Sequence, residues 1–391
     1  MGRRHAASGP LLVCMVVLAA GLALKLGQVH GSGPFEDPDV SDVRILYVQR
    51  QLNVGATPYL DYRPYHPGEP PKQLPPGATQ SAGWVEYPVG IGAAMWAAAQ
   101  PAHDADQFLA ITAVGLSAAA LLTVLLLAPT GTRAYLFAAS PLLLVYAFHN
   151  WDLLPVAAVT AAVTALRSER AGLAGALLGA GAILKIYPLL LVPAFFASRW
   201  LRGDRRGAVW LAGAAAAVVV AANVPIMLAN YQGWRTAYTF QQHRPPDINS
   251  VWFWMHHHFT VSNVNLASGV VTAALVIAGV ACVRYGASPV GVGAATIAGT
   301  IAVGKVASPQ YALWVLPFFP LLTVRVLWWA IFTVSELILW TAFFAQGYLG
   351  VHGSGYVEPA VFLRAAVLLA LIPVFLLSRD VVPVPAAERA P

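Results

Sequence analysis

Long apolar runs separated by short polar segments dominate the chain. These runs lie near residues 11–29, 107–128, 134–148, 153–166, 171–184, 187–198, 207–229, 262–283, 289–304, 310–324, 326–345 and 359–377. The pattern predicts an all-α polytopic membrane protein with about 12 transmembrane helices. The runs 153–166, 171–184 and 187–198 are shorter than the roughly 20 residues that a perpendicular helix needs to cross the hydrocarbon. We expect short or broken helices around a cavity there, because interrupted backbone at membrane depth must be satisfied by protein or water.

Charged residues lie almost entirely outside the apolar runs and indicate an orientation. If Met1 is cytoplasmic and the chain crosses at each run, twelve of the seventeen acids fall in outward segments and thirteen of the twenty-three Lys and Arg in inward ones. Lys and Arg favour the cytoplasmic side. We therefore predict a multi-pass protein of the cell membrane with both termini cytoplasmic and any active site extracytoplasmic. Residues 1–30 could also be a cleaved signal peptide, but Gly21–Val29 is a weak cleavage site, so we favour a retained first span.

This topology predicts one membrane domain over residues 1–391. A large first extracytoplasmic loop covers 30–106, a second covers 230–261, and 378–391 form a cytoplasmic tail. The run 89–102 is too short and too rich in Gly for a confident span. We expect it to form a helix on the outer surface.

Composition excludes two classes of protein. At 58% apolar and 10% charged residues, with a mean hydropathy of +0.65, the chain has about half the usual charge and is not water-soluble. The net charge of +6 comes from short inward loops, which is a topological pattern and argues against nucleic-acid binding. Cys14 and Cys282 both fall inside predicted spans and are interpreted as small hydrophobic residues, not as a disulfide or metal pair.

An acidic cluster follows the first span. Asp37, Asp39 and Asp42 precede an apolar helical pattern, and either Ser41 or Asp42 could cap a helix that begins there. A carboxylate at a helix start is kept ionised and oriented by the helix dipole, which suits general-base chemistry. Asp42 follows the span by a dozen residues and so lies near the lipid head groups. The alternative is that these acids only cap and solvate a surface loop.

Two lysines lie where apolar runs break at the predicted outer boundary. Lys185 and Lys305 are each followed by a Pro and a Tyr, and we expect them to contact a phosphate at head-group height. The alternative is that each lysine only reaches the interface from a span end. Arg244 is a weaker candidate for the same anion. Of the triplet 256–258, His257 could touch phosphate, but consecutive histidines do not converge on one metal ion, so no metal site is predicted.

Other polar and aromatic residues of the outward segments could bind a ligand. Asp152, in the turn that begins at His149, could hydrogen-bond sugar hydroxyls or only cap the helix that follows. Trp252 could stack on a sugar ring or a prenyl chain. Glu336 lies inside a predicted span, where a carboxylate needs a partner, and the sequence names none.

Five short motifs follow one another along the chain. They are Ser41-Asp42 with Tyr47, Glu86-Tyr-Pro88, His149-Asn-Trp-Asp152, Leu184-Lys-Ile-Tyr-Pro188 and Ser308-Pro-Gln-Tyr-Ala-Leu-Trp314. Taken together, the motifs resemble the family 87 glycosyltransferases of the GT-C superfamily, whose best-known members are actinobacterial mannosyltransferases that use polyprenyl-phosphate-mannose. The likeness runs from about residue 11 to residue 377. It implies a GT-C-like fold and an inverting transfer that needs neither a metal nor another cofactor.

The resemblance also implies a catalytic Asp in the first outer loop. By position it is Asp42, with Asp39 and Asp37 as alternatives, because Pro38, Val40 and Ser41 here separate acids that adjoin in many GT-C enzymes. The residues expected to contact the sugar or the acceptor are Asp152, Asn150, Glu86, Tyr87, Trp252, Gln310 and Tyr311.

The resulting hypothesis is that the protein transfers a sugar at the extracytoplasmic face of the cell membrane. Nucleotide sugars are absent there, so the donor would be a sugar on a polyprenyl phosphate, whose phosphate leaves without a general acid. Asp42 would deprotonate a hydroxyl of a lipid or glycan acceptor while Lys185 and Lys305 hold the phosphate. Membrane lipids are the other expected partners. The exact sugar, the acceptor and the oligomeric state stay open.

Two other functions compete with this hypothesis. A transporter or flippase of lipid-linked sugars would also have interrupted helices, but it needs polar residues at mid-membrane. Here the spans carry little charge apart from Lys25, Glu336 and Arg364, which favours an enzyme that works at one surface. A protein that has lost catalysis and serves as an assembly partner also stays open.

Overall fold

The computed structural model describes residues 2–29, 41–63, 82–255, 259–344 and 354–383, and these residues form a helical bundle with no strand. Six segments are long and apolar enough to cross a membrane, which agrees with the predicted all-α polytopic membrane protein. They are Ala7–Gly27, Ala105–Ala138, Arg205–Ala229, Val261–Arg284, Val326–Phe344 and Val357–Leu377. They correspond to α1 (Gly2–Val29), α4 (Ala105–Leu127) with η2 and α5, α10 (Arg205–Ala229), α13 (Val261–Arg284), α17 (Val326–Phe344) and α18 (Val357–Leu377).

The remaining apolar runs form shorter or broken helices. These are η2 (Ala128–Ala134), α5 (Tyr135–Ala138), α6 (Pro141–Tyr146), α7 (Leu153–Arg167), α8 (Ala171–Ala182), η3 (Tyr187–Leu191), α9 (Val192–Leu201), α14 (Pro289–Val303), η5 (Pro309–Tyr311), α15 (Ala312–Val315) and α16 (Phe318–Leu321). The breaks coincide with prolines such as Pro188 and Pro309, which lack the amide proton that a continuous helix requires. The expected short and broken helices are therefore present.

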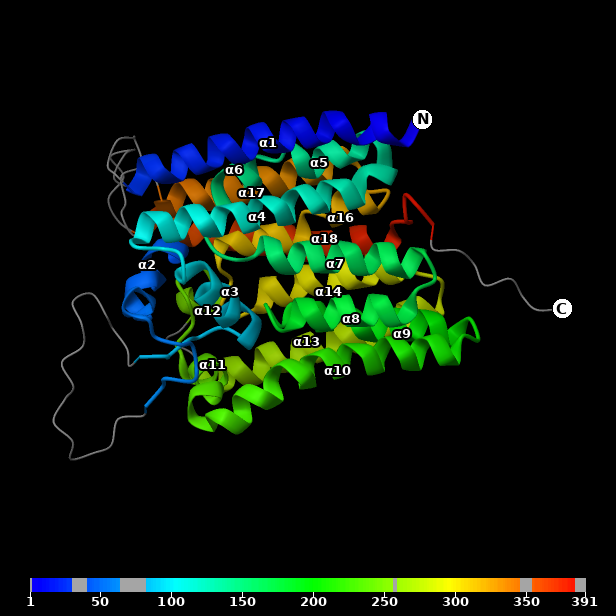
Figure 1. Cartoon of the computed structure of the whole chain (residues 1–391). Helices are drawn as coiled ribbons and strands as arrows, with labels where there is room; N and C mark the ends of the chain where they lie inside the picture. The colour runs from blue at the N-terminus through cyan, green and yellow to red at the C-terminus, as the bar shows by residue number, and fades with distance from the viewer. Residues whose placement is uncertain (1, 30–40, 64–81, 256–258, 345–353, 384–391) are drawn as a thin grey trace.

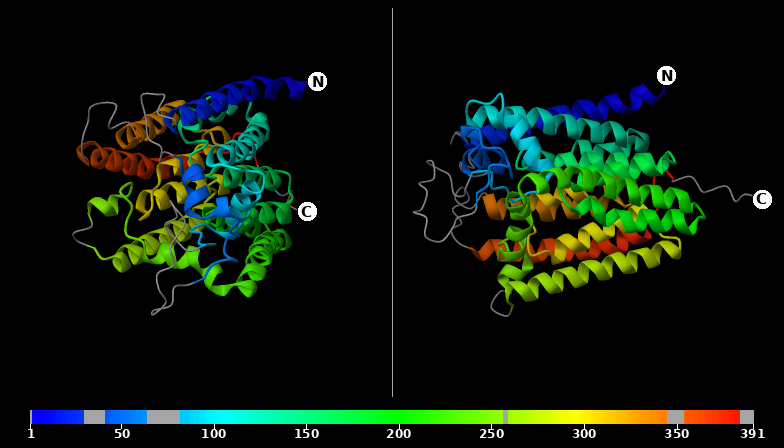
Figure 2. Two further views of the ribbon diagram at one scale, coloured as in Figure 1. Left: turned by 60° about the vertical axis from the view of Figure 1, so that its left-hand side comes forward. Right: turned by 60° about the horizontal axis from the view of Figure 1, so that its bottom comes forward.

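The long helices lie side by side, and both ends of the described chain lie at one end of the bundle (Figures 1 and 2). Short helices gather at the opposite end, which we call the cap end. They are α2 (Asp42–Gln49), η1 (Leu52–Val54), α3 (Val89–Ala99), α11 (Tyr231–His243), α12 (Val251–Trp254) and η6 (Ser354–Tyr356). The described residues of the predicted outward segments thus meet at one end of the molecule.

Small residues let α8 and α10 pack closely. A Cβ added to Gly175 would lie 1.9 Å from the backbone oxygen of Leu211, and one added to Gly179 would lie 2.6 Å from that of Ala215. Gly at such an interface allows two backbones to approach, as is common between membrane helices. The same device joins α3 to the end of α8, because Gly90 donates its amide to the oxygen of Ile183 at 2.7 Å.

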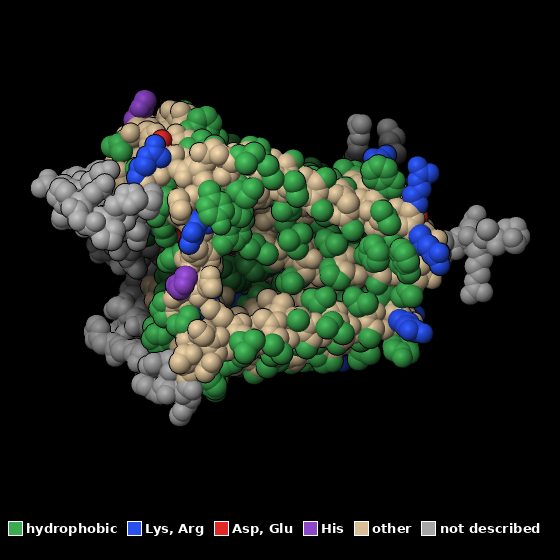
Figure 3. Space-filling view, turned by 90° about the horizontal axis from the view of Figure 1, so that it is seen from below, with side chains coloured by type: hydrophobic (Ala, Val, Ile, Leu, Met, Phe, Trp, Pro, Cys, Tyr) green, Lys and Arg blue, Asp and Glu red, His purple; other side chains and the backbone are tan. Residues whose placement is uncertain are grey.

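The outer face of the bundle is apolar. Large hydrophobic side chains of α10 and α13, such as Trp210, Val220, Leu266 and Ile277, are exposed. Seen from below, hydrophobic side chains cover the length of the bundle, and Lys and Arg gather towards its ends (Figure 3). An apolar belt between charged ends is the surface that a bilayer requires.

Several unusual residues in or beside the predicted spans have clear positions in the bundle. Cys14 is buried and Cys282 is partly buried, and both are free thiols. Glu336 of α17 pairs with Arg364 of α18, with 2.9 Å between Oε1 and Nε, so the missing partner of the buried carboxylate is on the neighbouring helix. Arg133 donates through Nη2 to the backbone oxygens of Phe319, Leu322 and Val324, at the end opposite the cap end.

Candidate active site

The start of α2 places Asp42 at the cap end of the bundle. Ser41 occupies the N-cap position, but its side chain does not cap the helix and instead donates to the backbone oxygen of Phe148 at 3.1 Å. Tyr47, further along α2, donates to the oxygen of Ala102 at 3.0 Å. These bonds attach α2 to the turn after α6 and to the segment before α4. Asp42 therefore has a defined direction at the helix start, where the dipole favours a negative charge.

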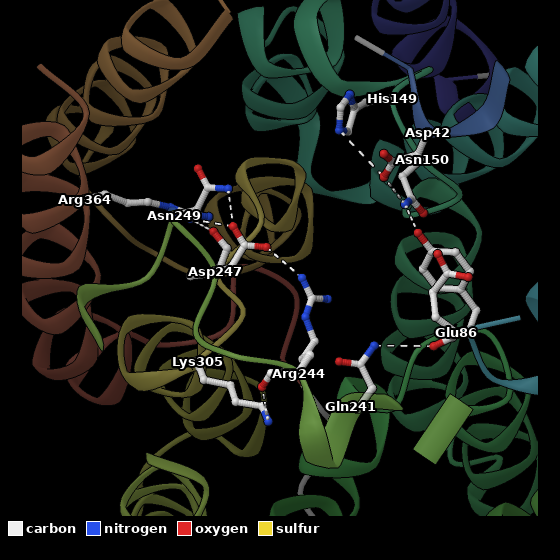
Figure 4. Close-up of polar contacts among 12 residues, drawn as sticks. Asp42, Glu86, His149, Asn150, Gln241, Arg244, Asp247, Asn249, Lys305 and Arg364 are labelled. Carbon is white, nitrogen blue, oxygen red and sulfur yellow. Dashed lines mark hydrogen bonds and ion pairs between the residues drawn. The ribbon is translucent and has the colours of Figure 1, made fainter. Parts of the chain in front are cut away.

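Asn150 connects Asp42 to the interior of the site. Its Nδ2 atom donates to Asp42 Oδ2 at 2.7 Å and to the Tyr87 hydroxyl at 2.8 Å, while its own Oδ1 accepts the amide of Trp151 at 2.7 Å (Figure 4). Nε2 of His149 lies 3.8 Å from the same Asp42 oxygen. The Asp42 side chain is 35% exposed, whereas Asn150 is 1% exposed. A buried amide thus positions a carboxylate that a substrate can reach.

Lys185 lies in the break between α8 and η3, surrounded by a carboxylate and two aromatic rings. Its Nζ is 3.8 Å from Oδ1 of Asp152, 4.4 Å from the ring centre of Tyr87 and 6.0 Å from that of Tyr311. Such rings attract a cation electrostatically. The ammonium group is therefore kept at this position by charge and ring contacts.

Asp152 is fully buried beneath Lys185. Its Oδ1 accepts the indole N–H of Trp314 at 2.7 Å, and Oδ2 has no hydrogen-bond partner among the described residues. Burial raises the pKa of Asp152 above its usual value, against the opposing effects of Lys185 and Trp314. The side chain makes no capping bond to α7, so the interpretation of Asp152 as a helix cap is wrong.

Three aromatic rings form a stack beside these charges. The ring of Trp314 lies 4.2 Å from that of Tyr187 and 3.8 Å from that of Tyr311, with interplanar angles of 13° and 20°. η3 contributes Tyr187, η5 contributes Tyr311 and α15 contributes Trp314, so the stack joins two broken segments of the chain. The stack forms an aromatic wall with a large apolar contact area.

A cavity of about 500 Å³ lies against this wall. It is lined by Glu86, Tyr87, Pro88, Lys185, Ile186, Tyr187, Leu190, Ala237, Tyr238, Gln241, Thr272, Thr300, Ile301, Gly304, Lys305, Val306, Tyr311 and Trp314. Five residues predicted from the sequence therefore share one cavity: Glu86, Tyr87, Lys185, Lys305 and Tyr311. Its size and its mixture of apolar and polar groups suit a small-molecule site.

Lys305 approaches the cavity from the side opposite Asp42 (Figure 4). Its Nζ donates to the backbone oxygens of Gln242 at 3.3 Å and Arg244 at 3.2 Å, and its own oxygen accepts the amide of Asp247 at 2.8 Å. Arg244 pairs with Asp247 at 2.9 Å. Burial, and secondarily the charge of Arg244, lower the pKa of Lys305 below its usual value. A bound anion would offset both effects.

Glu86 lines the cavity, but its carboxylate is already held. Arg50 donates to it through Nε at 2.8 Å and Nη2 at 2.7 Å, and the guanidinium group lies 4.2 Å from the ring centre of Trp84. Gln241 donates to the backbone oxygen of Glu86 at 3.4 Å.

Sequence reasoning missed Arg50 and Gln241, since both come from segments without a recognisable motif. Tyr187 and Trp314 were present in the quoted motifs but were given no role.

The other predicted residues do not line this cavity. Trp252 donates its indole N–H to the oxygen of Val303 at 2.7 Å. Gln310 is 3% exposed, and its Oε1 has no hydrogen-bond partner among the described residues. Asp37, Asp39 and His257 lie outside the described residues. In the part of the chain that the structure describes, no group of three or more His, Cys, Asp or Glu side chains could hold a metal ion.

Comparison with known proteins adds an independent finding. Residues 84–309, more than half of the chain, match Glycosyltransferase family 87. The matched segment is narrower than the likeness over residues 11–377, and it includes Lys185 and Lys305 but neither Asp42 nor the helices α17 and α18. No curated protein matches the chain.

Proposed function

The chain belongs to glycosyltransferase family 87 and is a membrane glycosyltransferase, and on that premise we propose that it moves a sugar from a polyprenyl-phosphate donor to a hydroxyl of a lipid or glycan acceptor. We propose that this transfer takes place on the extracytoplasmic face of the cell membrane, with mannose as the first sugar to test. The main support is that Lys185 and Lys305, from two different helix breaks, line one cavity beside the residues that hold Asp42.

The donor would lie in the cavity with its phosphate between the two lysines. Both cations come from backbone breaks, so the groups that must hold a phosphate are in place before it binds, and this reduces the cost of reorganisation. The aromatic stack that includes Tyr311 would lie against the sugar. Leu190 and Ile301 give the cavity an apolar wall, where the first units of a prenyl chain would pack.

Asp42 would act as the base on the acceptor. Its Oδ2 accepts the bond from Asn150, while Oδ1 accepts no hydrogen bond from the residues that the structure describes. The acceptor hydroxyl would give its proton to this carboxylate as its oxygen bonds to the anomeric carbon. The bond between that carbon and the phosphate oxygen breaks, the electron pair leaves with the phosphate, and the configuration inverts.

The direct test uses purified protein with radiolabelled polyprenyl-phosphate-mannose and an extracted lipid pool, followed by identification of the labelled product. Asp42→Asn should retain donor binding but lower the transfer rate by at least about 10²-fold, which is the usual contribution of a general base. Lys305→Ala should raise the KM for the donor. Full activity of Asp42→Asn would remove this residue from the role of base.

Asp106→Asn is a matched control. Asp106, on α4, accepts a 2.8 Å bond from Arg44 and is 41% exposed, so this change also removes a carboxylate near the start of a helix. It should leave transfer within about twofold of the unaltered protein, as surface substitutions usually do. If no labelled product forms with mannose, the same assay with other polyprenyl-phosphate sugars tests the donor class.

A further inference from the structure

We propose that Arg364 of α18 is a positioning residue for the donor site: it holds the segment Gly304–Pro309 in the conformation that presents Lys305 and Tyr311 to the cavity. The part of this inference that concerns the donor rests on the proposed function. The positioning itself concerns only this chain and can be tested without a substrate.

The segment after α14 needs hydrogen-bond donors from elsewhere. α14 ends at Val303, and the chain does not become helical again until η5 begins at Pro309. Carbonyl groups in such a break have no intrahelical partner, and buried carbonyls without a partner are costly. Arg364 supplies two donors, because its Nη1 bonds the oxygen of Ala307 and its Nη2 bonds the oxygen of Ser308 at 3.2 Å.

The position of Arg364 is hard to explain by stability alone. Its side chain is 2% exposed and that of its partner Glu336 is 0% exposed, so both charges are removed from water. Replacing a buried ion pair by apolar side chains of similar volume is often neutral or stabilising. The bonds to Ala307 and Ser308 give this arginine a second task, since three separate nitrogens of its planar fork bond the carboxylate and the two neighbouring carbonyls at once.

The carbonyl groups that Arg364 bonds, those of Ala307 and Ser308, lie within three residues of Lys305. The oxygen of Ser308 also accepts the amide of Tyr311 at 3.0 Å, and this hydrogen bond closes the single turn of η5. Tyr311 then stacks on Trp314, and Trp314 bonds Asp152, the partner of Lys185. A shift of this segment would therefore displace both Tyr311 and Lys305.

The segment 247–254 at the cap end also packs on α17 and α18. Ile248, Val251 and Trp254 pack against a buried cluster that includes Leu339 of α17 and Val361 of α18. Asp247, just before them, donates its amide to Lys305. α17 and α18, which lie outside the segment matched to the family, thus support the part of the site that contains Lys305.

The test compares Arg364→Lys with Arg133→Lys. Arg364→Lys keeps the charge opposite Glu336, so the chain should still fold. It offers one nitrogen where Arg364 uses three, so it should lose carbonyl bonds of the segment. Arg133 also bonds backbone oxygens of a helix break, but at the other end of the bundle, so its replacement controls for general loosening. Affinity for farnesyl phosphate, a short prenyl phosphate, should fall about tenfold in Arg364→Lys and stay unchanged in Arg133→Lys.

Hydrogen exchange of the segment 304–311 is the second measurement. It should be faster in Arg364→Lys than in Arg133→Lys, because only the first substitution releases Ala307 and Ser308. In the transfer assay, Arg364→Lys should raise the KM for the donor more than it lowers kcat. The double variant with Lys305→Ala should lose less affinity than the two single losses predict together, since both act through Lys305.

Either of two results would overturn the positioning role. One is the same farnesyl phosphate affinity and the same exchange of 304–311 in Arg364→Lys as in the unaltered protein. The other is an equal change in both arginine variants. If the unaltered protein does not bind farnesyl phosphate, the proposed donor class is wrong, and faster exchange of 304–311 confined to Arg364→Lys would still support the positioning of this segment.

Discussion

Asn150 donates a 2.7 Å hydrogen bond to the carboxylate of Asp42, from a side chain that is almost completely buried. The same nitrogen donates to the hydroxyl of Tyr87, and the ring centre of Tyr87 lies 4.4 Å from Nζ of Lys185. The group proposed as the base and the group proposed to hold the phosphate are therefore connected by two side chains. This arrangement supports a role for Asn150 in orienting Asp42, and the contact with the sugar or the acceptor that the sequence suggested stays a prediction.

We expect Asn150→Ala to lower kcat by about 10-fold to 100-fold with a small change in the KM for the donor. The loss follows from the freedom that Asp42 gains when its buried partner is removed, since misplacement of a reacting group by 1 Å can cost about 10²-fold. Initial rates with the labelled donor measure both constants. A change confined to the KM for the acceptor would instead indicate direct contact between Asn150 and the substrate.

The lowered pKa of Lys305 predicts a pH dependence of donor binding. A lysine is charged below its pKa, and the pKa of an ordinary lysine is about 10.4. Because the pKa of Lys305 is lowered, Lys305 loses its charge at a lower pH than an ordinary lysine does. The KM for the donor should rise as the pH increases through this alkaline range. Lys305→Arg, whose guanidinium stays charged, should move the rise to higher pH. Identical pH profiles of both proteins would exclude Lys305 as the titrating group.

Breaking the pair Arg50–Glu86 should strongly destabilise the cap end. Glu86→Gln leaves Arg50 buried without its counter-charge, and breaking such a pair costs about 3 to 5 kcal/mol. Thermal unfolding of the protein in detergent would measure the loss. Replacing both residues by apolar ones should destabilise less than Glu86→Gln alone, and a larger loss in the double variant would contradict the charge argument.

The close packing of α8 on α10 predicts different effects for two glycines of α8. Gly175→Ala places a Cβ 1.9 Å from the oxygen of Leu211 and should destabilise the protein by about 1 to 3 kcal/mol, as overpacking usually does. Gly172→Ala meets nothing within 4 Å and should stabilise α8 by roughly 0.5 to 1 kcal/mol. Thermal unfolding of the two variants measures the difference. Equal unfolding temperatures of the two variants would mean that α8 and α10 can move apart at Gly175 without a loss of stability.

Part of the site was predictable because its residues lie where hydrophobicity changes abruptly. Lys185 and Lys305 interrupt apolar runs, and both line the cavity. The contacts of Glu86 and Asp152 were not predictable. Arg50, which is 36 residues away, holds Glu86, and Trp314, which is 162 residues away, donates to Asp152. No local pattern connects residues so distant in the chain.

The amino-acid sequence by itself determined that the chain is a helical membrane protein and that its unusual polar residues belong to one set of connecting segments. Both follow from hydrophobicity, which is a property of each short stretch alone. Only the tertiary structure decided that Asn150 holds Asp42, that Arg50 holds Glu86 and that Arg364 pairs with Glu336. A hydrogen bond needs its two atoms within about 3 Å, and that distance is set by how the helices pack and where each one breaks.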